Sequence, residues 1–157
     1  MQLAFAAGRA FVDRAENSLV EHWVVLSDGE LDEGSNWEAL LLVNSLGLSN
    51  LNIVIDRNRL QSIRGTESTV PLEPLADKFL SFNWEVEEVD GHSLTDISAA
   101  LNRASHSEKP TCLLARTKKG FPVQSMMEHG VLYHYRAATE SQLREFATLR
   151  VYGEDTP

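Results

Sequence analysis

The sequence WVVLSDGELDEG occupies residues 23–34, and the sequence LNIVIDRNRL occupies residues 51–60. Each begins with an apolar run that stops at a side chain carrying oxygen, as a buried strand does where it reaches the edge of its sheet. The segment between the runs has the length of a helix, so the pattern predicts two parallel strands joined by a crossover helix. Both polar loops would then lie at the carboxyl edge of one sheet, where open α/β sheets hold their ligands.

The rest of the chain continues this alternation. Two more strands are expected at residues 84–89 and 111–115, and the first of them suits a sheet edge because it is rich in acids. Helices are expected at 1–12, 35–47, 74–82, 93–101 and 139–149. The sequence thus predicts an α/β fold, a doubly wound and mostly parallel sheet with helices on both faces. Residues 1–157 are interpreted as a single, partial domain that begins within a helix.

Several local signals set the ends of these elements. Ser35 with Glu38, and Thr139 with Gln142, have the spacing of capping boxes at helix starts. The segments 57–71 and 120–135 show no regular period, and long irregular segments in compact domains are usually functional or mobile. We therefore expect two functional loops there.

Composition excludes several kinds of partner. The chain has 157 residues, 43% of them hydrophobic, with 14 basic against 23 acidic residues and a net charge of -9. This balance, without a basic stripe, argues against nucleic acid. The single cysteine, Cys112, lies in an apolar run and is expected to be a buried thiol in a reducing compartment. Arg9 interrupts the N-terminal apolar run, and no segment reaches the roughly 20 apolar residues of a membrane span. The protein is expected to be soluble and cytoplasmic, with no membrane partner.

The oxygen-bearing side chains at the two strand ends suit a metal-bound diphosphate. Mg²⁺ prefers oxygen ligands, which Asp28, the amide of Asn58 and a main-chain carbonyl after it can supply. Gly29 lets the backbone approach a phosphate closely. An Asp-Gly pair after a strand is also typical of an ordinary turn. A calcium-binding EF-hand loop is excluded, because its sixth and twelfth positions would be Glu33 and Ala39 instead of Gly and Glu.

Five ordered motifs together resemble a known family. They are SDGELDEGSNWEA at 27–39, NLNIVIDRNRLQ at 50–61, WEVEEVDGH at 84–92, KPTCLLARTKKG at 109–120 and MEHGVLYHYRA at 127–137. The first two are similar to the thiamine diphosphate motif of transketolases, which reads G-D-G, a spacer of this length, and then Asn. The resemblance extends from Trp23 to Leu149 and indicates the N-terminal, diphosphate-binding subunit of a split enzyme, shortened at its N-terminus.

The resemblance implies roles for individual residues. By this resemblance, Asp28, Asn58 and the carbonyl of Leu60 bind Mg²⁺, and Gly29 and Glu30 lie beside the diphosphate. It also implies a catalytic and cofactor-binding role for His134 and a subunit contact for Glu33. The implied cofactors are thiamine diphosphate and Mg²⁺. The implied reaction is the transfer of a two-carbon ketol unit between phosphorylated sugars. It would require a pyrimidine-binding C-terminal transketolase subunit, in a homodimer or heterotetramer.

Two departures from the family pattern keep other interpretations open. Ser27 stands where the motif has its first Gly, and Arg59 follows Asn58 where Gly is common. A side chain at 27 would crowd a diphosphate, and Arg adopts a positive φ less readily than Gly. One alternative is a shortened, non-catalytic remnant or assembly module of the same fold. Another is a thiamine diphosphate-dependent lyase or decarboxylase, against which the MEHGVLYH and DGH stretches favour the transketolase branch.

Overall fold

A sheet of parallel strands forms the centre of the computed structural model, which describes residues 2–149. Within these residues the sheet has four strands in the order β1-β2-β4-β3. Their bounds are β1 His22–Ser27, β2 Leu51–Arg57, β3 Glu85–Asp90 and β4 Thr111–Arg116. All four expected strands and their parallel direction are confirmed. Met1, which the first expected helix included, lies outside the described residues.

The register of the sheet determines where the site can lie. β2 is a central strand and pairs with both β1 and β4. Ser27 at the end of β1 is level with Asp56, and Arg57 is level with Arg116 at the end of β4. The loops that follow β1, β2 and β4 therefore leave the sheet side by side. The acidic strand β3 lies at an edge, as its composition predicted.

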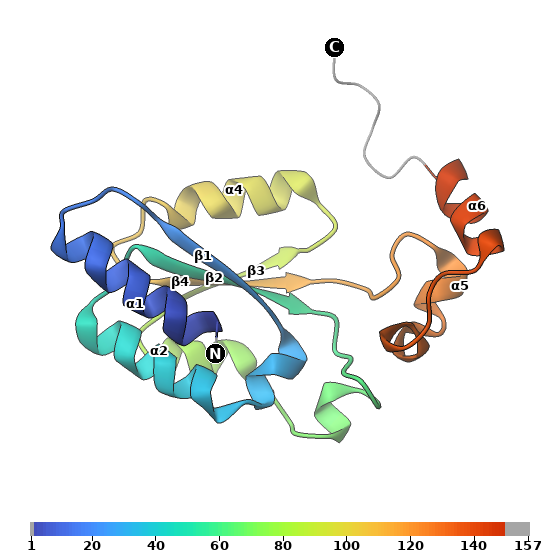
Figure 1. Ribbon diagram of the computed structural model, residues 1–157, viewed down its shortest axis with the longest axis horizontal. Coiled ribbons are helices and arrows are strands. Elements are labelled where there is room, and N and C mark those ends of the chain that lie inside the picture. The colour runs from blue at the N-terminus through green and yellow to red at the C-terminus, as the bar shows by residue number, and fades with distance from the viewer. Residues whose placement is uncertain (1, 150–157) are drawn as a thin grey trace, which may run out of the picture.

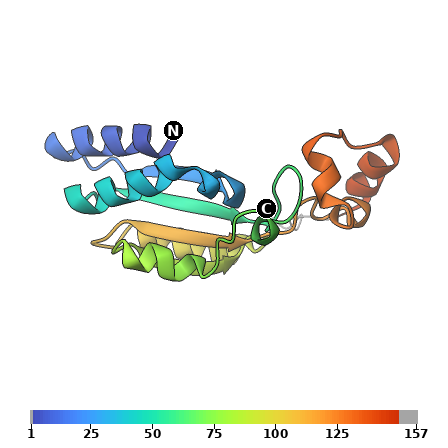
Figure 2. The same cartoon turned by 90° about the horizontal axis from the view of Figure 1, so that it is seen from below.

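Helices cover both faces of the sheet, which confirms the doubly wound arrangement. Helices α1 (Gln2–Ala15), α2 (Gly34–Leu46) and α3 (Leu75–Ser81) lie on one face, and α4 (Leu94–Ala104) lies on the other (Figure 1, Figure 2). The larger core forms beneath the three helices, with Leu40, Phe79 and Trp84 among its fully buried side chains. A smaller core joins Ala100 of α4 to Leu113 and Ala115 of β4.

One predicted helix start is wrong and one is confirmed. α2 begins at Gly34 with Glu33 as its N-cap, so the chain is already helical at Ser35, where a capping box was expected. The expected box at Thr139 with Gln142 does open α6 (Glu140–Thr148). At the C-terminus of α2, Gly47 has a φ of 62°, a left-handed conformation that Gly adopts without strain.

The two segments expected to be irregular loops contain short elements. Residues 57–71 hold a bridge between Leu60 and Gly65 and a 3₁₀ helix, Thr66–Ser68. Residues 120–135 hold α5 (Gln124–Met127) and another 3₁₀ helix, η3 (Gly130–His134). α5 and α6 lie beyond the arrowheads of the strands (Figure 1). None of the described helices is both long enough and apolar enough to cross a membrane.

Candidate functional site

A pocket of about 370 Å³ opens at the carboxyl edge of the sheet. Its lining comes from the loops after β1, β2 and β4 and from η3: Ser27, Gly29, Glu30, Glu33, Asp56, Asn58, Leu60, Gln61, Ser62, Lys119 and His134. Six of the residues to which the resemblance gives a role therefore line one pocket: Gly29, Glu30, Glu33, Asn58, Leu60 and His134. They are brought together because three neighbouring parallel strands end at the same level.

Asp28 lies buried between two pocket-lining residues and is tied to the loop after β2. Its Oδ2 accepts the backbone N–H of Arg59 at 2.6 Å and Nη1 of Arg57 at 2.9 Å. Its Oδ1 is buried with no partner in the described structure. Burial raises the pKa of the Asp28 carboxyl, and the hydrogen bonds from Arg57 and Arg59 offset only part of this effect. Asp28 is thus joined to the loop that contains Asn58 and Leu60.

The side chain of Asn58 is held at both ends of its amide. Its Oδ1 accepts the backbone N–H of Leu60 at 2.9 Å, and its Nδ2 donates to Oδ2 of Asp56 at 3.2 Å. Leu60 in turn lies against η3, since a Cβ on Gly130 would come within 2.8 Å of Leu60 Cδ1. The segment that carries His134 therefore packs directly on the loop expected to bind the metal.

The turn after β1 is shaped by Glu30. One oxygen of its carboxylate, Oε2, accepts both the backbone N–H and the hydroxyl of Ser27, at 2.8 and 2.9 Å. These bonds fix the 3₁₀ helix η1 (Asp28–Asp32) that positions Asp28. The backbone is tight at Gly29, where a Cβ would lie 3.2 Å from the Cβ of Gln61. Glu30 lines the pocket, but its carboxylate is already hydrogen-bonded within the turn.

Arg57 is a structural centre that the sequence did not reveal. Its side chain is 4% exposed, and its guanidinium donates to Asp28, to Oγ1 of Thr66 at 2.9 Å, and to Glu67 and Glu73 at 2.7 Å each. The hydrogen bond from Arg57 is the main reason that the pKa of Glu73 lies below its usual value. Arg57 thus fastens the loop after β2 to the buried carboxylate of Asp28.

Two further pocket residues carry or can carry positive charge. Lys119 follows β4, and His134 ends η3. Burial and the charge of Lys119 lower the pKa of His134, which keeps its imidazole neutral near neutral pH. Sequence analysis gave Lys119 no role of its own, although it lies in the KPTCLLARTKKG stretch. Its position just after a buried strand, at the same edge as Asp28 and Asn58, is the signal that could have identified it.

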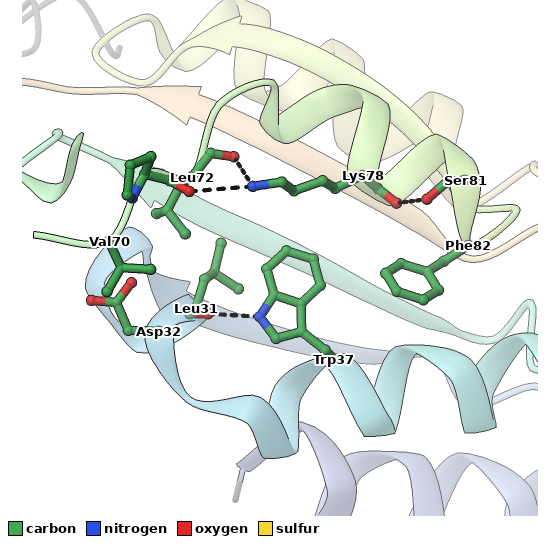
Figure 3. A pocket seen from close by; sticks show the side chains of 9 residues that line it. Leu31, Asp32, Trp37, Val70, Leu72, Lys78, Ser81 and Phe82 are labelled. Atoms are coloured by element: carbon green, nitrogen blue, oxygen red, sulfur yellow. Dashed lines mark hydrogen bonds between the residues drawn. The ribbon is translucent and has the colours of Figure 1, made fainter.

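A second pocket of about 370 Å³ lies between η1, α2 and α3. Figure 3 shows Asp32 and Val70 at one end and Phe82 at the other, with the indole of Trp37 between them. Trp37 Nε1 donates to the carbonyl of Leu31 at 2.7 Å. None of the residues implicated by the sequence lines this pocket, so the site predicted from the sequence is the one at the carboxyl edge.

The backbone at Arg59 is left-handed, with a φ of 63°, where the sequence motif commonly has Gly. This conformation costs an L-residue roughly 1–2 kcal/mol, while Gly loses roughly 0.5–1 kcal/mol more in chain entropy. We expect Arg59→Gly to raise the free energy of unfolding by up to ~1 kcal/mol, and the β-branched Arg59→Val to lower it by ~1–2 kcal/mol. Urea denaturation measures both. Arg64, whose φ is not positive, is the control position. There we expect Arg64→Gly to be less stable than the wild type.

Comparison with known proteins identifies the family of the chain. The family of transketolase thiamine diphosphate-binding domains matches residues 1–147. One subunit of apulose-4-phosphate transketolase, from Phocaeicola vulgatus, is 34% identical over 144 residues, which cover 91% of this chain and 51% of that protein. A 6-deoxy-6-sulfo-D-fructose transketolase subunit of a Clostridium species is 34% identical over 116 residues, covering 73% of this chain and 42% of that protein. The chain thus spans about half the length of these relatives.

Solved structures give the same result. The transketolase of Campylobacter jejuni has a TM-score of 0.74 and 25% identity, covering 79% of this chain and 21% of that chain. The transketolase of Leishmania mexicana has a TM-score of 0.69 and 26% identity, covering 78% of this chain and 20% of that chain. With the match over residues 1–147, these likenesses show that the chain belongs to the family of transketolase thiamine diphosphate-binding domains.

Proposed function

We propose that this chain is the diphosphate-binding part of a split transketolase-like enzyme. With a pyrimidine-binding partner chain it transfers a two-carbon ketol unit between phosphorylated sugars in the cytoplasm, as a homodimer or heterotetramer. Two relatives are named as transketolase subunits, which supports a partner. Their names also favour the transketolase branch over a lyase. In this proposal residues 1–157 form one partial domain.

The observation that carries the proposal is that Asp28 is hydrogen-bonded to Arg59, in the same loop where Asn58 and Leu60 are hydrogen-bonded to each other. A buried carboxylate oxygen without a partner, Oδ1 of Asp28, marks a place for a cation. The other donors available are an amide oxygen and a main-chain carbonyl, and such oxygens are what Mg²⁺ takes up. Within residues 2–149 no group of three or more His, Cys, Asp or Glu side chains is arranged to hold a metal ion. The donor chemistry therefore fits Mg²⁺ held by Asp28, Asn58 and Leu60.

The charge of the pocket explains why a cation is needed there. Glu30, Glu33 and Asp56 line it and would repel a diphosphate, whereas Lys119 is a single opposing charge. A divalent ion beside Asp28 offsets this excess of negative charge, because a bound cation is often the largest local charge in a site. Lys119 then attracts the diphosphate, and the close backbone at Gly29 lies beside it.

The chain's contribution to the reaction is binding and orientation. Bound thiamine diphosphate supplies the carbanion chemistry. His134, neutral in its pocket, offers one donor and one acceptor nitrogen, and we propose that it hydrogen-bonds the substrate or the diphosphate. The packing of Gly130 on Leu60 holds η3, and with it His134, against the metal loop. The residue that activates the aminopyrimidine comes from the partner in this proposal.

Calorimetric titration tests the function. Thiamine diphosphate with Mg²⁺ is titrated into the chain alone and into the chain with a co-encoded candidate partner. We expect binding with metal and partner, and none with thiamine, which lacks the diphosphate, or with EDTA present. Binding would then justify an assay of ketol transfer.

The alternative is the non-catalytic assembly module. It is favoured by one observation, since Arg57 already occupies Oδ2 of Asp28. No heat from folded, partner-bound protein would support this alternative and contradict the roles proposed for the site residues.

A further inference from the structure

Asp56 lines the pocket but is not among the residues proposed to bind the metal or the diphosphate. It is the penultimate residue of β2, level with Ser27 of β1 and Ala115 of β4. Its two carboxylate oxygens have different partners: Oδ2 accepts from Nδ2 of Asn58 at 3.2 Å, and Oδ1 accepts from the hydroxyl of Thr117. Within the described residues Asp56 forms no ion pair with a basic side chain. Its carboxylate is used for these hydrogen bonds.

The two neighbours of the Asn58 amide select one of its two orientations. Rotation of the amide by 180° would exchange an oxygen and a nitrogen of almost the same size. The flipped group would turn its NH₂ toward the N–H of Leu60, donor against donor, and its oxygen toward the carboxylate of Asp56, acceptor against acceptor. Both contacts favour the observed orientation, in which Oδ1 accepts from Leu60 and keeps a second lone pair.

Asp56 is itself held from the neighbouring strand. Thr117 follows β4, and its backbone N–H donates to the carbonyl of Arg57 at 3.4 Å, which continues the β2–β4 ladder. Gly91 lies against the other side of Thr117, since a Cβ there would come within 2.4 Å of Thr117 Cγ2. Thr117 is therefore confined, and its hydroxyl determines where the carboxylate of Asp56 lies.

We propose that Asp56, held by Thr117, is a positioning residue that keeps the amide oxygen of Asn58, and not its nitrogen, available to a cation. The effect on metal affinity rests on the proposed function, but the orientation of the amide does not. A hard cation takes the amide oxygen and cannot take the NH₂ group. Residues that orient a metal ligand typically account for 10- to 100-fold in metal affinity.

The orientation is tested first in the metal-free chain by NMR. The nuclear Overhauser effect between the Leu60 amide proton and the side-chain NH₂ protons of Asn58 reports which end of the amide faces Leu60. We expect a weak effect in the wild type and in Asp56→Asn, whose own oxygen can still accept from Asn58. A stronger effect is expected in Asp56→Ala, because only the N–H of Leu60 then opposes the flipped orientation and a larger share of the amides adopts it. The same weak effect in Asp56→Ala would overturn the proposal.

The second test measures Mn²⁺ binding by electron paramagnetic resonance, with thiamine diphosphate and the partner chain present. We expect Asp56→Ala to weaken binding by about 10- to 100-fold and Asp56→Asn by much less. Thr117→Val should fall between them, and Thr117→Ser should match the wild type. Equal losses in Asp56→Asn and Asp56→Ala would overturn the positioning role, because Asp56 would then act through its charge or as a ligand. A wild-type assembly that binds no Mn²⁺ would reject the proposed function, while the NMR comparison would still decide the orientation.

Discussion

Asp28→Asn is expected to abolish Mg²⁺-dependent thiamine diphosphate binding in the complete assembly. The variant keeps an oxygen that can accept from the N–H of Arg59, and Arg57 keeps Glu67 and Glu73 as charged partners, so the chain should still fold. It removes the negative charge that a buried cation would face. Loss of one partner from a buried charge pair costs about 2–5 kcal/mol, roughly 30-fold to several thousand-fold in affinity. Calorimetry with and without Mg²⁺ measures the change.

Asp90→Asn is the matched control for this experiment. Asp90 also ends a parallel strand at the carboxyl edge, but it is exposed and accepts only the N–H of His92 among its side-chain contacts in the described structure. Its variant should bind the cofactor like the wild type. Unchanged affinity in Asp28→Asn, with a circular dichroism spectrum like that of the wild type, would remove Asp28 from the metal site.

Arg57→Met is expected to cause the largest loss of stability. The variant leaves the fully buried carboxylate of Asp28 without its charged partner and releases Glu67 and Glu73. Removing one member of a buried ion pair typically costs about 3–5 kcal/mol. Urea denaturation followed by tryptophan fluorescence measures the free energy of unfolding.

Two further variants make the Arg57 experiment specific. Arg103→Met breaks the exposed pair with Glu87 and should change stability little, because solvent already screens that pair. The double variant Arg57→Met with Asp28→Leu removes the stranded charge and should regain much of the lost stability. A loss in Arg57→Met no larger than in Arg103→Met would contradict the role given to Arg57.

The strand pattern and the carboxyl-edge rule were enough to predict the main features of the fold. Buried strands read as apolar runs, and parallel strands bring their following loops together, so the proximity of Asp28 to the Asn58 loop followed from the sequence. The helix start at Ser35 was misjudged because a capping signal of the right spacing lay inside a region that was already helical. The turn that precedes a helix also influences where the helix begins, and the spacing of a capping box carries no information about that turn.

Other parts of the site depend on contacts that no local pattern encodes. Arg57 acts through Glu67 and Glu73, which lie 10 and 16 residues further along the chain. His134 reaches the pocket through the packing of Gly130 on Leu60, two residues that are far apart in the chain. The amide of Asn58 is oriented by Asp56 and, through it, by Thr117 of the next loop. Such long-range partners become visible only in three dimensions.

The sequence separations of these contacts also have a consequence for the order in which the site can form. The bond between Asp28 and Arg59 spans 31 residues, within one strand-helix-strand unit. The bond between Asp56 and Thr117 spans 61 residues and can form only after β4 has been synthesised. Doubling a loop adds only about 0.6 kcal/mol of closure entropy, so the difference lies in timing more than in stability. On a ribosome, the acidic half of the site would be synthesised before the lysine and histidine that complete it.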